Sequence, residues 1–155
     1  MRRFFVALLF AAGLLVGERS SAAAEPDLAE PATIEGKWKL VATTWYGKES
    51  KNEVGLVWEF QGKNRFTMNF AGGRTLEGRY WLDTTKKPWQ VDIETTEDDP
   101  AVGGGGRRKG IVSLDGDRLQ LCVSGSAGAP RPTKMVSKIG TLDILRSLKR
   151  LEQKQ

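Results

Sequence analysis

Apolar and polar residues alternate along most of this chain, in short segments separated by turn-forming residues. In residues 65–70, Phe66, Met68 and Phe70 alternate with polar side chains. Period-two alternation is typical of antiparallel strands with one face in the core and the other in water. The pattern predicts strands at residues 38–45, 54–60, 65–70, 75–83, 89–94, 110–114, 118–123, 134–138 and 142–150.

The separators are rich in glycine and in other residues that favour turns, such as Gly47-Lys48 and Asp115-Gly116. Strands do not alternate with helices, which argues against a parallel sheet. Eight or nine short strands joined in this way predict an all-β fold, an antiparallel sandwich or an up-and-down barrel.

Three segments depart from the regular pattern. Residues 97–108 are acidic, then glycine-rich, then basic, and we expect a mobile hairpin connection there. Residues 125–132 contain two prolines and predict an extended crossing. Residues 142–151 suit a strand, but Leu142, Leu145, Leu148 and Leu151 also fit a helix. The strand is favoured, and the helix remains the alternative.

The first 24 residues resemble a secretory signal peptide. Arg2 and Arg3 precede an apolar run of 13 residues, 4–16, and small residues follow up to Ala24. The run is shorter than the roughly 20 residues that span a bilayer. We therefore expect cleavage after Ala24, export to the periplasm or the medium, and no transmembrane segment in the mature chain.

The charge of the chain gives little reason to expect a nucleic-acid partner. The formal net charge is +5, and it falls to +3 without residues 1–24. The last ten residues carry that excess, so the body is close to neutral. Nucleic-acid surfaces need clustered basic charge with interleaved aromatic residues, and this pattern is absent from the sequence.

The chain contains no histidine and a single cysteine, Cys122. Histidine-dependent nucleophilic mechanisms and histidine-ligated metal sites are thereby excluded. One cysteine allows no internal disulfide, and Cys122 is expected to be a small core residue. Asp115 and Asp117 could contribute to a calcium site, but Asp-Gly between apolar strands favours a hairpin turn. We expect no metal, no other cofactor and no enzymatic activity.

Gly36-Lys37-Trp38 on the first strand, together with Arg150 on the last, resembles the lipocalin pattern. In that superfamily the tryptophan packs at the closed end of the barrel, and a basic residue from the final strand lies across its ring. The resemblance implies that Trp38 and Arg150 form a structural pair that closes the barrel, and a guanidinium over an indole is favourable.

Over residues 34–150 the chain is similar to a lipocalin-like domain of unknown function that is abundant in planctomycete bacteria. The resembling segments include residues 36–41, 58–60, 78–83, 86–93, 114–122, 131–133 and 148–150. The chain departs from that family at Val112, where Tyr is usual, and at Met135, where Phe is common. The resemblance implies a lipocalin-like barrel and export, and it implies no reaction.

A barrel of about eight strands can hold one small ligand. The candidate lining for a hydrophobic or amphipathic ligand is Phe66, Met68, Phe70, Tyr80, Val91, Val112 and Leu121. These residues would equally well fill a solid core. Basic residues near a rim could neutralise an anionic head group, although they are more simply solvated; they are Arg79, Lys86, Lys87 and Arg131.

The alternative function is a structural or interaction domain of the cell envelope, with a filled barrel and a protein partner. Trp45, Trp81 and Trp89 are expected to lie outside the main core and to contribute to such an interface. The resulting organisation is a signal peptide at 1–24, a linker at 25–33, the barrel at 34–150 and a basic tail at 151–155.

We predict that Trp38→Ala lowers the free energy of unfolding by roughly 3–5 kcal/mol, because the substitution empties a large buried site at the barrel floor. Chemical denaturation of the two proteins measures the difference. A loss below about 1 kcal/mol would contradict the role given to Trp38.

Overall fold

The computed structural model describes residues 33–96 and 105–152, and these form nine strands and no helix. The expected signal peptide, the linker before Thr33, residues 97–104 and the end of the tail from residue 153 lie outside the described residues. The strands are β1 (Gly36–Trp45), β2 (Lys48–Ser50), β3 (Val57–Gln61), β4 (Arg65–Asn69), β5 (Thr75–Asp83), β6 (Trp89–Thr95), β7 (Gly106–Asp115), β8 (Arg118–Val123) and β9 (Ile144–Arg150).

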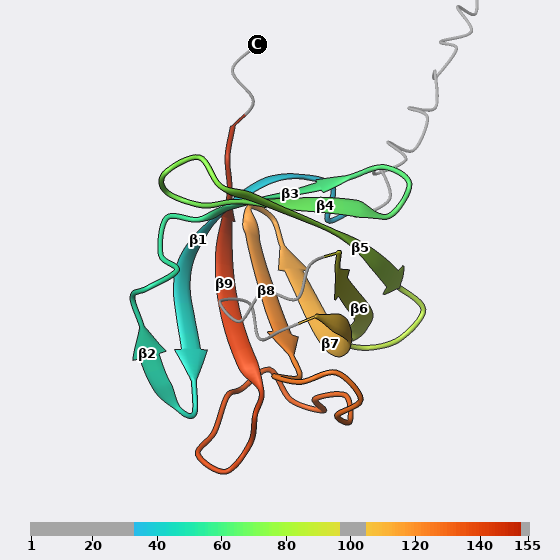
Figure 1. Ribbon diagram of the computed structural model, residues 1–155. Coiled ribbons are helices and arrows are strands. Elements are labelled where there is room, and N and C mark those ends of the chain that lie inside the picture. Colours follow the sequence, from blue (N-terminus) through green and yellow to red (C-terminus); the bar gives the residue numbers. More distant parts are fainter. Residues whose placement is uncertain (1–32, 97–104, 153–155) are drawn as a thin grey trace, which may run out of the picture. The chain divides into compact units, whose positions relative to one another are not determined.

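The strands form one antiparallel sheet that closes on itself. From β3 to β9, each strand pairs with its neighbours in sequence, and β9 then pairs with β1 (Figure 1). The short β2 extends the sheet beside the second half of β1, whereas β3 pairs with the first half. The predicted all-β, antiparallel up-and-down barrel is confirmed: eight strands close it, and β2 is an extra strand.

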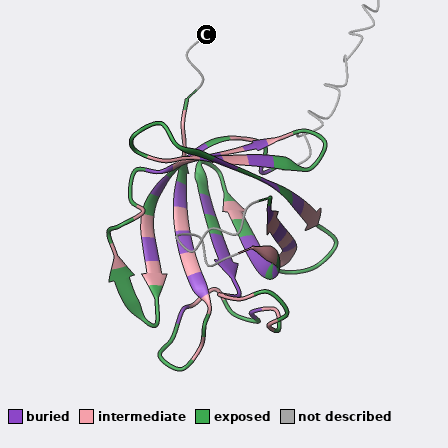
Figure 2. Ribbon diagram, viewed as in Figure 1, coloured by how far each residue is buried: buried purple, intermediate pink, exposed green. Residues whose placement is uncertain are grey.

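Alternation along each strand separates the interior of the barrel from the solvent. In β5, Leu76, Gly78 and Tyr80 are buried, and the residues between them are exposed (Figure 2). The same period holds in β4 and β9. Since side chains of a strand point alternately to opposite faces, the buried set forms one continuous core inside the closed sheet.

A β-bulge interrupts the alternation in β1. The register against β9 shifts between Leu40 and Ala42, so Val41 has no partner in the ladder. A bulge adds one residue to one strand and changes which side chains point inward beyond it. Before the bulge Trp38 and Leu40 are buried, and after it Thr43 takes the inward position with 4% of its surface exposed.

The strand predicted at residues 134–138 does not form. These residues are bends and irregular chain, and Ser137 is the one buried side chain among them. The physical reason is the closure of the barrel, because β9 pairs with both β8 and β1 and leaves no free edge beside them. The segment lies against the outer face instead, where the Cys122 thiol is 3.8 Å from the Val136 carbonyl oxygen.

The start of β7 also differs from expectation, and the choice between strand and helix at the C-terminus is settled. Strand β7 begins at Gly106, so Arg107 and Arg108 belong to the sheet and not to the predicted loop at 97–108. Their pairing with Glu94 and Ile93 extends the β6–β7 ladder. The C-terminal segment is a strand from Ile144 to Arg150, as favoured over the helix, because both neighbouring strands offer it hydrogen-bonding partners.

Gly78 provides a test of this interior packing. A Cβ atom at Gly78 would collide with the Phe66 ring and lie 2.5 Å from the Glu94 carbonyl oxygen. We predict that Gly78→Ala lowers the free energy of unfolding by about 1–3 kcal/mol. The matched control is Gly62→Ala, where the nearest atom is the Glu35 carboxylate at 4.0 Å. Equal effects in urea denaturation would contradict the packing of Phe66 on Gly78.

Candidate functional site

One part of the barrel interior is filled by aromatic rings. Phe66 stacks on Trp58, with ring centroids 5.5 Å apart, and Phe60 lies 6.1 Å from Phe66. Tyr80 meets Phe60 edge to face at 5.2 Å, and its hydroxyl donates to the carbonyl oxygen of Gln61. Such contacts add to the stabilisation from apolar burial, and they identify this region as packed core.

The structure brings the predicted cavity residues together inside the barrel. Each of them faces inward, and all except Phe70 are at least 95% buried; the buried ones are Phe66, Met68, Tyr80, Val91, Val112 and Leu121. Phe70 is partly buried against the same core, with the Arg74 guanidinium 4.6 Å from its ring centroid. Phe66 and Tyr80 contact other rings directly, so they serve the core whether or not a ligand binds beside them.

A second part of the interior is polar. Arg146, on β9, is 3% exposed and makes a two-point contact with Glu53. Arg146 Nε donates to Glu53 Oε2 at 3.0 Å, and Nη2 donates to Oε1 at 3.2 Å. The Thr43 hydroxyl donates to the same carboxylate at 3.3 Å. Glu53 lies in the turn between β2 and β3 and is thereby fixed against two strands of the closing ladder.

A second guanidinium lies close to this pair. Arg108, on β7, is 3% exposed, and its pKa is lowered to about 10. The largest cause is burial, which disfavours the charged form; the positive charge of Arg146 acts in the same direction, and Glu53 opposes both. Even at this pKa, Arg108 carries its charge at neutral pH. Two buried cations therefore share the field of the Glu53 carboxylate.

Trp58 joins the aromatic and polar parts of the interior. Its ring stacks on Phe66, and the Arg146 guanidinium carbon lies 5.7 Å from its ring centroid. Its indole N–H is buried and has no hydrogen-bond partner among the described residues. A buried donor without a partner costs stability, and here it is available to an acceptor inside the barrel. We call Thr43, Glu53, Trp58, Arg108 and Arg146 the internal polar cluster.

The sequence contains a signal for part of this cluster that the alternation analysis missed. Arg146 has the same parity as the buried Ile144 and Leu148, and Arg108 has that of Val112. A charged side chain in the apolar phase of a strand points into the core. Thr43 gives no such signal, because the bulge at Val41 changes its direction, and Glu53 lies in a turn.

Trp38 and Arg150 lie together at one end of the barrel. Trp38 is fully buried, and the Arg150 guanidinium carbon is 4.1 Å from its ring centroid. Arg150 also donates to the carbonyl oxygen of Glu35 at 2.9 Å. Gly36 has a φ of 119°, and a Cβ there would lie 2.8 Å from Arg150 Nη1. The glycine therefore leaves room for the guanidinium that covers the tryptophan.

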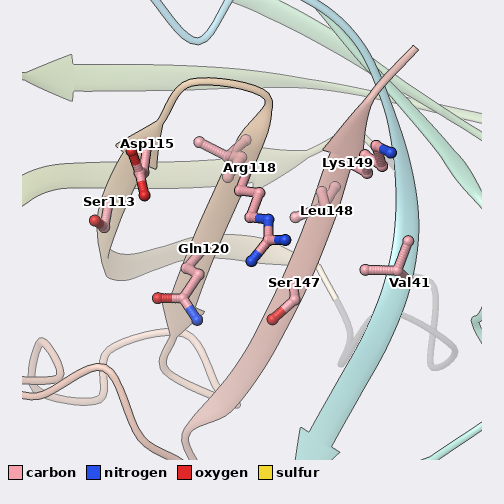
Figure 3. A pocket seen from close by; sticks show the side chains of 9 residues that line it. Val41, Ser113, Asp115, Arg118, Gln120, Ser147, Leu148 and Lys149 are labelled. Carbon is pink, nitrogen blue, oxygen red and sulfur yellow. The ribbon is translucent and has the colours of Figure 1, made fainter.

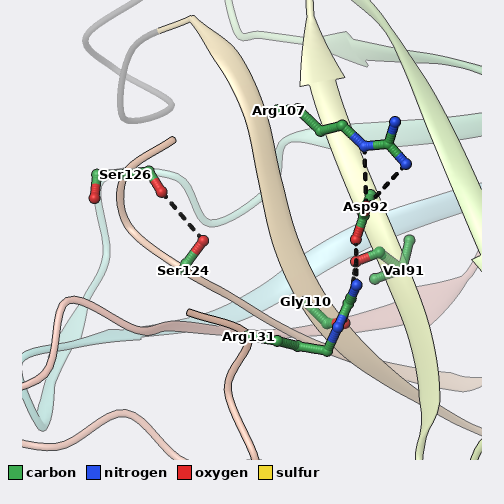
Figure 4. Close-up of polar contacts among 7 residues, drawn as sticks. All are labelled: Val91, Asp92, Arg107, Gly110, Ser124, Ser126 and Arg131. Atoms are coloured by element: carbon green, nitrogen blue, oxygen red, sulfur yellow. Dashed lines mark hydrogen bonds and ion pairs between the residues drawn. The ribbon is translucent and has the colours of Figure 1, made fainter. Parts of the chain in front are cut away.

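Of the four basic residues considered for a rim, Arg131 is held in a structural contact. Its guanidinium donates to the carbonyl oxygens of Val91 and Gly110 and to Asp92, at 2.7 Å for Asp92 (Figure 4). Arg107 binds the other oxygen of Asp92 at 2.9 Å. These bonds attach the crossing segment to the outer face of β6 and β7. Arg79, Lys86 and Lys87 are exposed, as expected for solvated charges.

The tryptophans expected outside the core differ from one another. Trp45 is 44% exposed. Trp81 is partly buried, with the Arg107 guanidinium carbon 4.1 Å from its ring centroid. Trp89 packs against the core, so placing it outside was wrong. Its position follows from β6, where Trp89, Val91 and Ile93 share the inward parity.

Several aspartates on the strands and turns have structural roles. Asp83 accepts hydrogen bonds from the backbone N–H and hydroxyl of Thr85, and these bonds lower the pKa of its carboxyl group. Asp92, on β6, binds Arg107 and Arg131. Asp115 ends β7, and Gly116 makes the predicted hairpin to β8. In the described residues, no three acidic or cysteine side chains are grouped to hold a metal ion.

The outer face of the barrel carries a hollow of about 430 Å³ over β1, β7, β8 and β9 (Figure 3). Its lining combines polar side chains such as Ser113, Gln120 and Ser147 with charges of both signs. Cys122 faces outward nearby but is covered, and burial raises the pKa of its thiol to about 11, with a further contribution from Asp143. Neither the hollow nor Cys122 offers buried charged side chains such as those of the internal polar cluster.

Comparison with known proteins gives no functional assignment. No family model and no curated protein matches this chain. A crystal structure of an uncharacterized protein from Bacteroides eggerthii, determined at 2.60 Å resolution, is similar with a TM-score of 0.46 and 17% identity; the match covers 76% of this chain and 98% of that one. Within the described residues, no helix is long and apolar enough to cross a membrane.

We predict that Glu53→Ala lowers the free energy of unfolding by about 3 kcal/mol, because it leaves Arg146 buried without its carboxylate partner. The control is Glu49→Ala, which removes an exposed carboxylate from β2 and should change stability by less than about 0.5 kcal/mol. Urea denaturation of both variants measures the difference. Similar stabilities would contradict a buried ion pair at Arg146.

Proposed function

We propose that this protein is an exported, non-catalytic lipocalin-like barrel that binds a small amphipathic ligand. The anionic group of the ligand would lie against Arg108 and Arg146, and its apolar part would extend from there to the ring of Trp58 at the edge of the packed core. The proposal places the mature chain in the periplasm or the medium, after removal of residues 1–24.

The observation that carries this proposal is the burial of two guanidinium groups, each 3% exposed, inside the barrel and next to its apolar core. Buried ion pairs contribute little to net stability, because desolvation offsets their attraction. Buried charge with shifted pKa values is more common at functional sites than elsewhere. The burial of Arg108 beside Arg146 supports the proposal, and the lowered pKa of Arg108 agrees with it.

The chemistry of the cluster selects the class of ligand. An anion near Arg108 and Arg146 would relieve the repulsion between the two cations, and the low dielectric would strengthen the attraction. A carboxylate or sulfonate oxygen would also accept a hydrogen bond from the Trp58 N–H, which has no partner within the described part of the chain. A neutral hydrophobic ligand would gain neither interaction.

A pair of fluorescent probes tests the proposal. We predict that the processed chain binds the anionic probe 1-anilinonaphthalene-8-sulfonate. Arg108→Gln should weaken this binding about tenfold, which corresponds to the loss of one charge-assisted hydrogen bond. The neutral probe N-phenyl-1-naphthylamine should bind both proteins within about a factor of three. Fluorescence titration gives the dissociation constants, and circular dichroism confirms that each protein is folded.

The control is Lys109→Gln, which removes one positive charge from the next, outward-facing position of β7. It should leave the affinity for the anionic probe within about a factor of two. Equal effects of Arg108→Gln and Lys109→Gln would place the binding outside the barrel. Failure of the unmodified protein to bind either probe would favour the alternative, a filled barrel that acts as an interaction domain.

A further inference from the structure

Large apolar side chains gather on two neighbouring turns at one end of the barrel. The end of β1 and the turn after it carry Trp45 and Tyr46, which are 44% and 42% exposed and stack with ring centroids 5.3 Å apart. The loop before β9 carries Ile139, 82% exposed, and Leu142, 47% exposed. We call these four residues the apolar tip.

The two turns form one surface. A Cβ built on Gly47 would lie 3.4 Å from the Ile139 nitrogen and 3.6 Å from its Cγ1 atom, and the Gly47 N–H faces the Ser137 hydroxyl at 3.4 Å. Trp45 pairs with Ile144, two residues after Leu142. Figure 1 shows both turns below β1 and β9, at the same end of the barrel.

The loop that carries Ile139 has a defined conformation. The Thr141 N–H donates to the Lys138 carbonyl oxygen at 3.2 Å, and the Thr141 hydroxyl donates to the same atom at 3.1 Å. Gly140, with a φ of 87°, allows this tight turn. Ile139 is therefore presented to solvent at the tip of a closed turn.

Single exposed apolar residues are common, but several in contact mark an interaction site. The residue types favour a membrane surface. Tryptophan and tyrosine rings prefer the interface between water and lipid, and an aliphatic side chain beside them can enter the acyl region. The tip is small and convex, formed by two turns, which suits a deformable lipid layer.

The charges around the tip select the kind of lipid. The two turns and their flanks carry four exposed lysines; these are Lys48, Lys51, Lys134 and Lys138. The same segments, 44–51 and 133–143, hold two carboxylates, Glu49 and Asp143. Burial raises the pKa of the Asp143 carboxyl group, and a hydrogen bond from Thr141 opposes part of this rise. The excess of lysine is complementary to anionic phospholipid head groups.

We propose that the apolar tip docks this protein onto the surface of a bilayer that contains anionic phospholipid. Ile139 enters the outer acyl region, Trp45 and Tyr46 lie at the depth of the head groups, and the lysines contact phosphate. This interaction is independent of the ligand proposed for the interior, because none of its residues belongs to the internal polar cluster.

The first test uses vesicles of phosphatidylcholine with 30% phosphatidylglycerol, with part of the phosphatidylcholine carrying brominated acyl chains. We expect these vesicles to quench the fluorescence of Trp45, and we expect this quenching to disappear in Trp45→Phe and to persist in Trp81→Phe. Residues 1–32 contain no tryptophan. Quenching therefore reports on the tip even if residues 1–24 are retained. Identical quenching in Trp45→Phe and the unmodified protein would overturn the proposal.

The second test compares apolar residues inside and outside the tip. Ile139→Ser should weaken vesicle binding at least fivefold in co-sedimentation, whereas Val54→Ser, which removes another exposed aliphatic side chain, should change it less than twofold. Vesicles without phosphatidylglycerol, or high salt, should bind less protein. Equal binding of the two variants would overturn the proposal. The proposal would also be overturned if the protein did not bind vesicles but self-associated, and if Ile139→Ser abolished that self-association. The tip would then be a protein interface.

Discussion

Strands β1 and β9 are the first and last strands of the barrel in the sequence. They pair at seven positions, from Trp38–Arg150 to Trp45–Ile144. This ladder removes the open edges that the first and last strands would otherwise present to solvent. It also brings Arg150 over Trp38 at one end and Arg146 beside Thr43 in the middle. Both the covered floor and the internal polar cluster depend on this single closure.

The interior combines two kinds of packing that have opposite energetic effects. The rings around Phe66 stabilise the fold through apolar burial and edge or stacking contacts. Arg108 and Arg146 lose hydration in the same enclosure, and Glu53 compensates this loss in part. Trp58 contacts both regions. The barrel therefore holds charged groups in a rigid, poorly hydrated setting, which is the usual requirement for selective recognition of an anion.

Most of the fold could be predicted from the alternation of apolar and polar residues, because a strand with one buried face repeats every two residues. Residues 65–70 and 75–83 show the rule clearly. It failed at residues 134–138, where a suitable pattern found no free strand edge. It also failed at β7, where Arg107 and Arg108 resembled a loop although their backbone pairs with β6. Pairing partners are distant in sequence, so local patterns do not reveal them.

The candidate site was predictable only in its apolar part. Phe66, Tyr80 and Leu121 face inward as their parity requires. Arg146 belongs to the basic C-terminal residues, and charge usually indicates solvent, although its parity matches that of Ile144 and Leu148. The inward direction of Thr43 depends on the bulge at Val41. That bulge is evident only from the register of β1 against β9. Glu53 reaches the site from a turn through tertiary packing that has no periodic signature.

The closing ladder also has a consequence for the order of events during synthesis. Trp38 pairs with a residue more than a hundred positions later in the chain, and contacts of such sequence separation form slowly. Synthesis proceeds from the N-terminus, so β1 leaves the ribosome long before β9 is made. Until then, β1 has an apolar face and an edge without its partner strand, and the barrel cannot close.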